Sequence, residues 1–445
     1  MKKYQLFIDG KWVDSVSGKT FTSINPATKE INGIIAEGDA ADVDLAVKAA
    51  RKAFESGPWA SMSPSERGRL LYRAAQKLWE NVDYLAEVES NDNGLTINET
   101  KLIAIPAAID VLEFYAGMAN KIQGDTLASP ANRFNYTLRE PVGVVGAIVP
   151  WNFPIMLTMW KLAPALAAGN TIVIKPAEQT PISVLELARL LQEAGIPDGV
   201  INVVNGYGPT AGAALASHPD VDKIAFTGST ATGRLIMQAA SKHLKPISLE
   251  LGGKSPNIVF DDADIDAAIS GSLFGIYFAQ GQVCAAGSRL FVQETIYDRF
   301  VEEFARKAES IRVGHPLDPN TQMGPQVSEE QLNIIERYVQ IGKQEGATLV
   351  TGGKRNEECG NGFYYTPTVF ADVDNNMTIA REEIFGPVVS MYVNTFSMLD
   401  SAAPFGGMKQ SGFGRELGIE AMNMYTQTKH VWVDLSQEKF NWYGL

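Results

Sequence analysis

The residue with the clearest chemical potential is Cys284, which lies among small and polar residues over positions 278–289. Small neighbours leave room for another molecule to approach the sulfur. A thiolate is a strong nucleophile where its surroundings lower its pKa or supply a base. A buried, inert cysteine is the competing interpretation, because cysteine is among the most buried residue types. The stretch alone favours neither.

Three other polar residues stand at the ends of apolar runs that we interpret as strands. Glu250 is either a structural ion-pair partner or a base with a raised pKa. Asn152, in a Pro-Trp-Asn-Phe-Pro turn, either stabilises that turn or donates its amide to a developing oxyanion. Lys175 grips a phosphate or ribose, or is solvated. Because α/β folds bind ligands at strand ends, their joint occurrence predicts a site.

One glycine-rich stretch is well placed to bind a phosphate. Residues 228–233 follow a predicted strand and open a predicted helix, where free N–H groups and the helix dipole favour an anion. A simple helix cap by Ser229 is the alternative. Residues 206–212 miss the dinucleotide fingerprint by one position, and residues 252–255 lack the first glycine of a phosphate-binding loop.

Composition limits the classes of partner. The chain has 445 residues, enough for two or three domains, and a net charge of −13, which argues against nucleic acid or an anionic membrane surface. Two cysteines fit a reducing compartment, and the four histidines show no metal-ligand spacing. The N-terminal apolar run is too short for a signal peptide, and the run 141–160 is interrupted by prolines. We expect a cytoplasmic protein that does not enter membranes.

The periodicity predicts an α/β fold. Residues 4–13 predict a hairpin, residues 39–57 and 64–91 helices, and residues 133–149 β-structure. Strands and helices then alternate, which is typical of a parallel, doubly wound sheet. The predicted strands are 142–149, 171–175, 201–204, 223–226 and 247–251, and the predicted helices are 155–168, 182–194, 209–217 and 231–242.

A second α/β segment follows residue 257. Here we predict helices at 265–278, 296–312 and 319–343 and a strand at 290–292. The tail, residues 429–435, alternates like an edge strand. Exposed edges are usually covered, so this strand is expected to pair with another domain or subunit.

Seven motifs in order make the chain resemble the NAD(P)-dependent aldehyde dehydrogenase superfamily, of the hydrolytic type, over nearly its whole length. They lie at residues 150–154, 175–178, 226–230, 249–254, 281–284, 383–387 and 404–407. The resemblance implies a Rossmann-type NAD-binding domain (1–121 and 142–250) and a second α/β catalytic domain (251–427). It also implies a small β oligomerisation element (122–141 and 428–445) that builds a homodimer or homotetramer.

The resemblance further implies catalytic roles. Cys284 matches the nucleophile that attacks the aldehyde, and Asn152 with the Cys284 N–H matches the oxyanion hole. Glu250 matches the base that activates water against the thioester. Lys161 and Glu416 match residues linked to positioning and proton relay. No metal is implied.

The same resemblance implies NAD-binding and aldehyde-binding residues. Lys175 and Glu178 match an adenosine-ribose clamp, and the Glu178 carboxylate would repel a 2′-phosphate, which favours NAD over NADP. The other implied cofactor contacts are Ile148, Pro150, Trp151, Gly208, Gly212, Phe226, Gly228, Ser229, Leu251, Gln331, Glu383 and Phe385. The implied substrate tunnel is apolar and aromatic, with Phe153, Trp160 and Phe405. It suits aliphatic, aromatic or retinoid-like aldehydes.

One place departs from the family pattern. After Ser390 the family continues for roughly 40 residues, as strand, helix, strand and helix, before the segment that matches 392–395. Either the protein lacks this unit, or the natural protein carries residues here that this sequence does not. We therefore keep two functions open: an active NAD-dependent aldehyde dehydrogenase, and a silent protein of this fold that retains nucleotide binding or a scaffold role.

Two other enzyme classes fit the sequence less well. A thiol hydrolase would need a histidine beside Cys284, and no histidine has a catalytic-looking context. The CoA-acylating relatives lack the hydrolytic glutamate, whereas Glu250 is present here.

Overall fold

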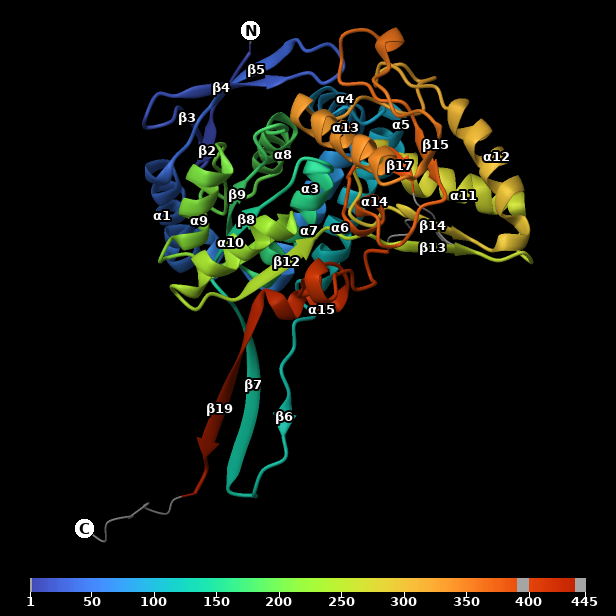
Figure 1. The fold of residues 1–445 in the computed structure, drawn as a ribbon. Coiled ribbons are helices and arrows are strands. Elements are labelled where there is room, and N and C mark those ends of the chain that lie inside the picture. Colours follow the sequence, from blue (N-terminus) through green and yellow to red (C-terminus); the bar gives the residue numbers. More distant parts are fainter. Residues whose placement is uncertain (1, 390–399, 437–445) are drawn as a thin grey trace.

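A computed structural model describes residues 2–389 and 400–436 and contains an eight-stranded sheet, of order β18-β12-β11-β8-β9-β10-β2-β3 (Figure 1). Its centre is parallel: β12 (Ile247–Leu251), β11 (Lys223–Gly228), β8 (Val144–Ile148), β9 (Thr171–Lys175) and β10 (Ile201–Val203). The edges are antiparallel: β18 (Gly412–Phe413), β2 (Leu6–Ile8) and β3 (Lys11–Val13). The predicted α/β class and the hairpin at 4–13 are confirmed, although the sheet is mixed at its edges.

Helices cover both faces of this sheet and bury an apolar core on each side. One face carries α3 (Pro64–Trp79), α4 (Val82–Asn93), α6 (Ile105–Met118), α7 (Pro154–Ala168) and α8 (Ile182–Glu193). The other carries α1 (Ala40–Ser56), α9 (Ala213–Ser217) and α10 (Thr230–Ser241). Every residue of α7 is buried, as expected for a helix that is apolar all round. Its rigid setting matters because the turn with Asn152 leads directly into it.

Three predicted helices differ in their bounds. The helix predicted over 64–91 is two helices, because α3 ends at Trp79 and α4 begins at Val82. The helix predicted over 209–217 is a π-helical turn at Gly208–Gly212 followed by α9. The helix predicted from residue 319 begins ten residues later, since the Ser328 side chain caps α13 (Glu329–Gln344) by accepting the Gln331 N–H.

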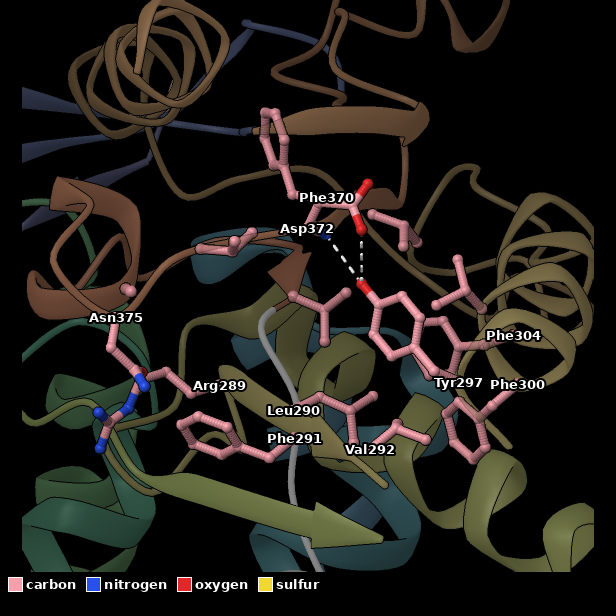
Figure 2. Close-up of a pocket in the computed structure, with 15 residues that line it drawn as sticks. Arg289, Leu290, Phe291, Val292, Tyr297, Phe300, Phe304, Phe370, Asp372 and Asn375 are labelled. Atoms are coloured by element: carbon pink, nitrogen blue, oxygen red, sulfur yellow. Dashed lines mark hydrogen bonds between the residues drawn. The ribbon is translucent and has the colours of Figure 1, made fainter. Parts of the chain in front are cut away.

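The segment that follows β12 contains two small sheets. β13 (Pro256–Val259) pairs with β14 (Arg289–Val292), and β16 (Thr368–Ala371) lies between β15 (Thr348–Thr351) and β17 (Val388–Val389). Helices α11 (Ile265–Tyr277) and α12 (Tyr297–Glu309) pack nearby. A cavity of about 180 Å³ lies between β14, α12 and β16, and Figure 2 shows Tyr297 reaching across it to Asp372. In the described part of the chain, β17 ends at Val389, next to the place where the sequence departs from the family pattern.

A β arm projects from the body of the molecule (Figure 1). β7 (Arg133–Pro141) lies between β6 (Thr126–Leu127) and β19 (Thr426–Asp434), and it pairs with β19 in antiparallel register over its whole length. The predicted tail strand is thus confirmed. The β18 strand joins the large sheet, although our division assigned residues 251–427 to the catalytic domain.

The remaining elements are short. They are β1 (Lys3–Tyr4), β4 (Thr20–Ile24), β5 (Ile31–Ala36), α2 (Pro58–Ser61), α5 (Ile97–Glu99), α14 (Thr378–Arg381) and α15 (Gly418–Met424). Over residues 2–389 and 400–436, no helix combines the length and the apolar character needed to cross a bilayer.

The small sheets are expected to be locally less stable than the centre of the large sheet. In the described part of the chain, β14 and β17 each pair with a strand on one side only, whereas β8 and β9 pair on both sides. We expect backbone amides of β14 and β17 to exchange with deuterium at least about a hundredfold faster than those of β8 and β9, because fewer contacts oppose local opening. Hydrogen-exchange mass spectrometry measures this, and equal protection would contradict it.

Candidate active site

A cavity of about 1040 Å³ opens where the parallel strands end. Gly228 and Leu251 are the last residues of β11 and β12, and Pro150 follows β8. This is the edge at which α/β sheets place ligands. The predicted site residues that line it are Pro150, Trp151, Asn152, Trp160, Gly228, Ser229, Glu250, Leu251, Cys284, Gln331, Glu383, Phe385, Phe405 and Glu416.

The other predicted residues lie outside this lining. Ile148 and Phe226 are partners in the β8–β11 register, and Gly208 and Gly212 belong to the π-helical turn. Lys175 and Glu178 form an ion pair of 2.7 Å at the end of β9, beside Gln179, which does line the cavity. Phe153 stacks on Phe278 with ring centroids 5.8 Å apart, and Lys161 lies behind Glu416.

A strained turn leads into Cys284. Ala279, Gln280 and Gly281 have φ of 51°, 56° and 75°, in the left-handed region. This conformation costs a non-glycine residue about 1–3 kcal/mol and persists only where the surroundings enforce it. A Cβ on Gly281 would collide with the Gly386 carbonyl, so glycine is required there.

The thiol is protonated at rest. Cys284 is partly exposed to the cavity. Burial, followed by the nearby carboxylates of Glu383 and Glu250, raises the pKa of the Cys284 thiol to about 12. Attack on a carbonyl therefore requires that a base remove the thiol proton first.

Glu250 lines the same cavity, and its carboxyl has the chemical character of a base. Burial, followed by the charge of Glu416, raises the pKa of the Glu250 carboxyl to about 8. Among the residues that the structure describes, its Oε1 has no hydrogen-bond partner. A carboxyl that titrates near neutral pH, and that is free to accept, can exchange protons with a thiol or a water.

Asn152 lies against the turn that precedes Cys284. Its side-chain Nδ2 donates to the Gln282 backbone carbonyl at 2.8 Å, and the backbone carbonyl of Asn152 accepts from Asn93 Nδ2 at 3.2 Å. Behind it, Glu89 accepts the Ile155 N–H of α7 at 3.0 Å. The amide is thus held beside the segment that carries Cys284, where it can donate to an oxyanion.

A buried ion pair adjoins the cavity. Lys161 Nζ donates to Glu416 at 2.5 Å and to the Thr227 hydroxyl at 2.6 Å. The two charged side chains are 0% and 2% exposed, so the pair is desolvated. Because Glu416 also raises the Glu250 pKa, the three groups are electrostatically linked.

Other residues of the same cavity are suited to an anion and a ribose. Ser229 caps α10 by accepting the Thr232 N–H, which leaves a helix N-terminus facing the cavity lining. Glu383 accepts the Gly253 N–H at 3.3 Å and approaches Gly252 so closely that a Cβ there would collide with it.

Several lining residues were missed by sequence reasoning. Lys254 is the most notable: burial lowers its pKa to about 8, and its Nζ has no hydrogen-bond partner within the described ranges. Its place after two motif glycines was the available signal. Gln179, Arg337 and Tyr338 also line the cavity, and nothing in the spacing of the helix that carries the last two distinguished them.

Known proteins match the chain closely. The profile of the Aldehyde dehydrogenase family matches residues 12–393 and 390–431. An aldehyde dehydrogenase of Emericella nidulans is 48% identical, covering 98% of this chain and 96% of its own. The human mitochondrial aldehyde dehydrogenase is 47% identical, with 98% and 92% covered. The NAD⁺ complex of the Bacillus cereus aldehyde dehydrogenase is 43% identical, with TM-score 0.95 and 98% and 97% covered.

These matches also support the departure after Ser390, a residue that itself lies outside the described ranges. The alignment with the human relative spans 480 positions against the 445 residues of this chain, so that relative carries residues that are missing here. The family profile breaks at 390–393, the same point. With matches that span nearly its whole length, the chain belongs to the aldehyde dehydrogenase family.

Proposed function

We propose that this protein oxidises an aldehyde to a carboxylic acid with NAD, through a covalent intermediate on Cys284. The observation that carries the proposal is the convergence of Cys284, Glu250 and Asn152 on one cavity at the strand ends. Incubation with NAD and a panel of aldehydes, followed by measurement of NADH, tests it. Absence of NADH with every aldehyde would reject it.

The chain's own residues divide the reaction into two steps. The Cys284 thiol loses its proton to solvent in the cavity, and Cys284 Sγ attacks the carbonyl carbon while Asn152 Nδ2 donates to the forming oxyanion. NAD, when bound, accepts the hydride that the resulting thiohemiacetal gives up. Glu250 takes a proton from water, which attacks the thioester and releases the acid. The buried pair Lys161–Glu416 is the neighbour through which that proton leaves.

The features around the cavity fit a dinucleotide. A helix N-terminus at Ser229 suits a pyrophosphate, and the paired side chains of Lys175 and Glu178 suit ribose hydroxyls. The unpartnered ammonium of Lys254 lies beside the Glu383 carboxylate, and both line the cavity. The Bacillus cereus relative was solved as an NAD⁺ complex, which supports the same cofactor here.

Glu178 predicts the preference for NAD over NADP. Glu178→Thr removes the charge that opposes a 2′-phosphate, so kcat/KM for NADP is expected to rise at least about tenfold. Glu178→Asp keeps the charge and is the matched control. Steady-state kinetics with both cofactors measure the ratio, and an unchanged ratio in Glu178→Thr would contradict the role.

The aromatic wall favours apolar aldehydes. Trp160 and Phe405 meet edge to face with centroids 4.9 Å apart, and Leu157 lies on the same lining. Such a surface gains from burying alkyl or aryl groups. We therefore propose aliphatic, aromatic or retinoid-like substrates.

The β arm supports self-association. Phe134 and Leu138 on β7 and Trp432 and Val433 on β19 are exposed, so the arm presents apolar side chains that a second copy would cover. We propose a homodimer or homotetramer built through this arm. The two cysteines are free thiols, which fits a reducing compartment such as the cytoplasm.

A second candidate is a silent protein of this fold. The departure after Ser390 favours it, because residues that the aligned human relative carries are missing here. Binding of NAD without formation of NADH would support this alternative. The intact mass decides whether further residues are present: 48.3 kDa is expected for this sequence.

A further inference from the structure

One buried carboxylate holds the turn that precedes Cys284. Glu99 is the last residue of α5, and its Oε1 accepts the Ala279 N–H at 2.8 Å. Glu99 is only 8% exposed and Ala279 is fully buried, so water does not compete for this bond. The two residues are 180 positions apart, and the bond therefore joins distant parts of the chain.

The surroundings of Glu99 are specific for a carboxylate. Its second oxygen, Oε2, accepts the Thr96 N–H at 2.8 Å and the Thr96 hydroxyl at 2.9 Å. All three of these neighbours are donors. A glutamine here would turn its NH₂ group toward a donor in either orientation, so even this isosteric change breaks one side of the arrangement.

Other contacts fix the same turn. Gln280 Nε2 donates to the Gly94 carbonyl at 2.9 Å, and Gln282 Oε1 accepts the Val327 N–H at 3.1 Å. Gly281 packs directly on the Gly386 carbonyl. Of the groups that fix the turn, Glu99 is the titratable one: burial raises the pKa of its carboxyl, whereas the hydrogen bonds from Ala279 and Thr96 favour the ionised form, which is the stronger acceptor.

A change in the conformation of residues 279–281 would move Cys284 and Asn152, the two groups that would act on the aldehyde carbonyl. Gln282, whose carbonyl receives the Asn152 amide at 2.8 Å, immediately follows the left-handed residues, and Cys284 is two positions further. We infer that Glu99 is a positioning residue: it holds residues 279–281 in their left-handed conformation and thereby sets Cys284 relative to Asn152. The inference rests on the proposed function, in which Cys284 is the nucleophile.

Matched variants separate positioning from helix capping. Glu99→Gln sets an NH₂ group against the Ala279 N–H or against the Thr96 donors, and this repulsion displaces the side chain from Ala279 in either orientation. Glu99→Asp keeps the charge but shortens the reach. Thr96→Val removes only the hydroxyl of the capping box and leaves Ala279 untouched. Glu66→Gln disrupts an equivalent box, Ser63–Glu66, at the start of α3, far along the chain from the turn.

Two readouts follow the nucleophile. Iodoacetamide labelling of Cys284, quantified on its peptide by mass spectrometry, reports the thiol itself, and NADH formation reports kcat. We expect both Glu99 variants to change the labelling rate at least about fivefold and to lower kcat at least about tenfold, with KM for NAD within about twofold. In Thr96→Val and Glu66→Gln, the labelling rate, kcat and KM for NAD are expected to stay within about twofold of the unmodified chain.

Two results would overturn the inference. One is labelling and kcat within about twofold of the unmodified chain in Glu99→Gln or in a folded Glu99→Asp. The other is an equal loss in Thr96→Val, which would assign the effect to capping. If the unmodified chain makes no NADH, the proposed function fails while the labelling comparison still decides the role of Glu99.

Discussion

Cys284→Ala is expected to abolish NADH formation, with kcat lowered at least about a thousandfold, because no other group replaces the covalent step. The loss is measured with NAD and the best aldehyde found in the panel. NAD binding, followed by quenching of tryptophan fluorescence, should remain within about twofold, since the thiol is not needed to hold the dinucleotide.

Cys359→Ala is the matched control for this variant. Cys359 is also a free thiol, but its Sγ contacts the Val313 carbonyl, and it is not part of the cavity lining. Full activity is therefore expected. Comparable loss in both variants would point to a general role of thiols in stability, and activity that survives Cys284→Ala would contradict the covalent mechanism.

Local patterns predicted most of the central sheet. The parallel strands are buried apolar runs, and α7 is apolar all round, so hydrophobic content alone indicated where they lie. Bounds were less predictable where a single polar residue decides them. Ser328 caps the start of α13, so residues 319–328, which we predicted as part of this helix, are not helical.

The candidate site was predictable from sequence only through its motifs. Nothing local to Cys284 indicates that Ala279 and Gln280 are left-handed, because the contact that enforces this comes from Glu99, 180 positions away. The proton-linked cluster is equally non-local: Lys161 and Glu416 are 255 positions apart. Spacing cannot reveal pairings that tertiary packing creates. Lys254 differs, because its place after two motif glycines was a local signal.

Glu250→Gln is expected to separate the two halves of the reaction. An amide cannot take a proton from water, so the acyl group should stay on Cys284 and kcat should fall about a hundredfold to ten-thousandfold. Rapid mixing is expected to show less than about one NADH per chain before turnover stalls, and intact-mass measurement should find the acyl group on the protein. Hydroxylamine, which attacks a thioester without a general base, should restore turnover.

The pH dependence follows from the same carboxyl. The Glu250 pKa is raised to about 8 by burial, and only the ionised form accepts a proton, so kcat should rise with pH and level off above this value. Below a pH of about 8 the protonated Glu250 carboxyl predominates, so hydrolysis of the thioester is slow. In Glu250→Gln the rise should disappear, and the hydroxylamine-supported rate should not show a midpoint near 8. A midpoint that persists in the variant would assign the titration to another group of the same cavity. The candidates are the Lys254 ammonium, with a pKa lowered by burial to about 8, and the Glu383 carboxyl, with a pKa raised by burial to about 7.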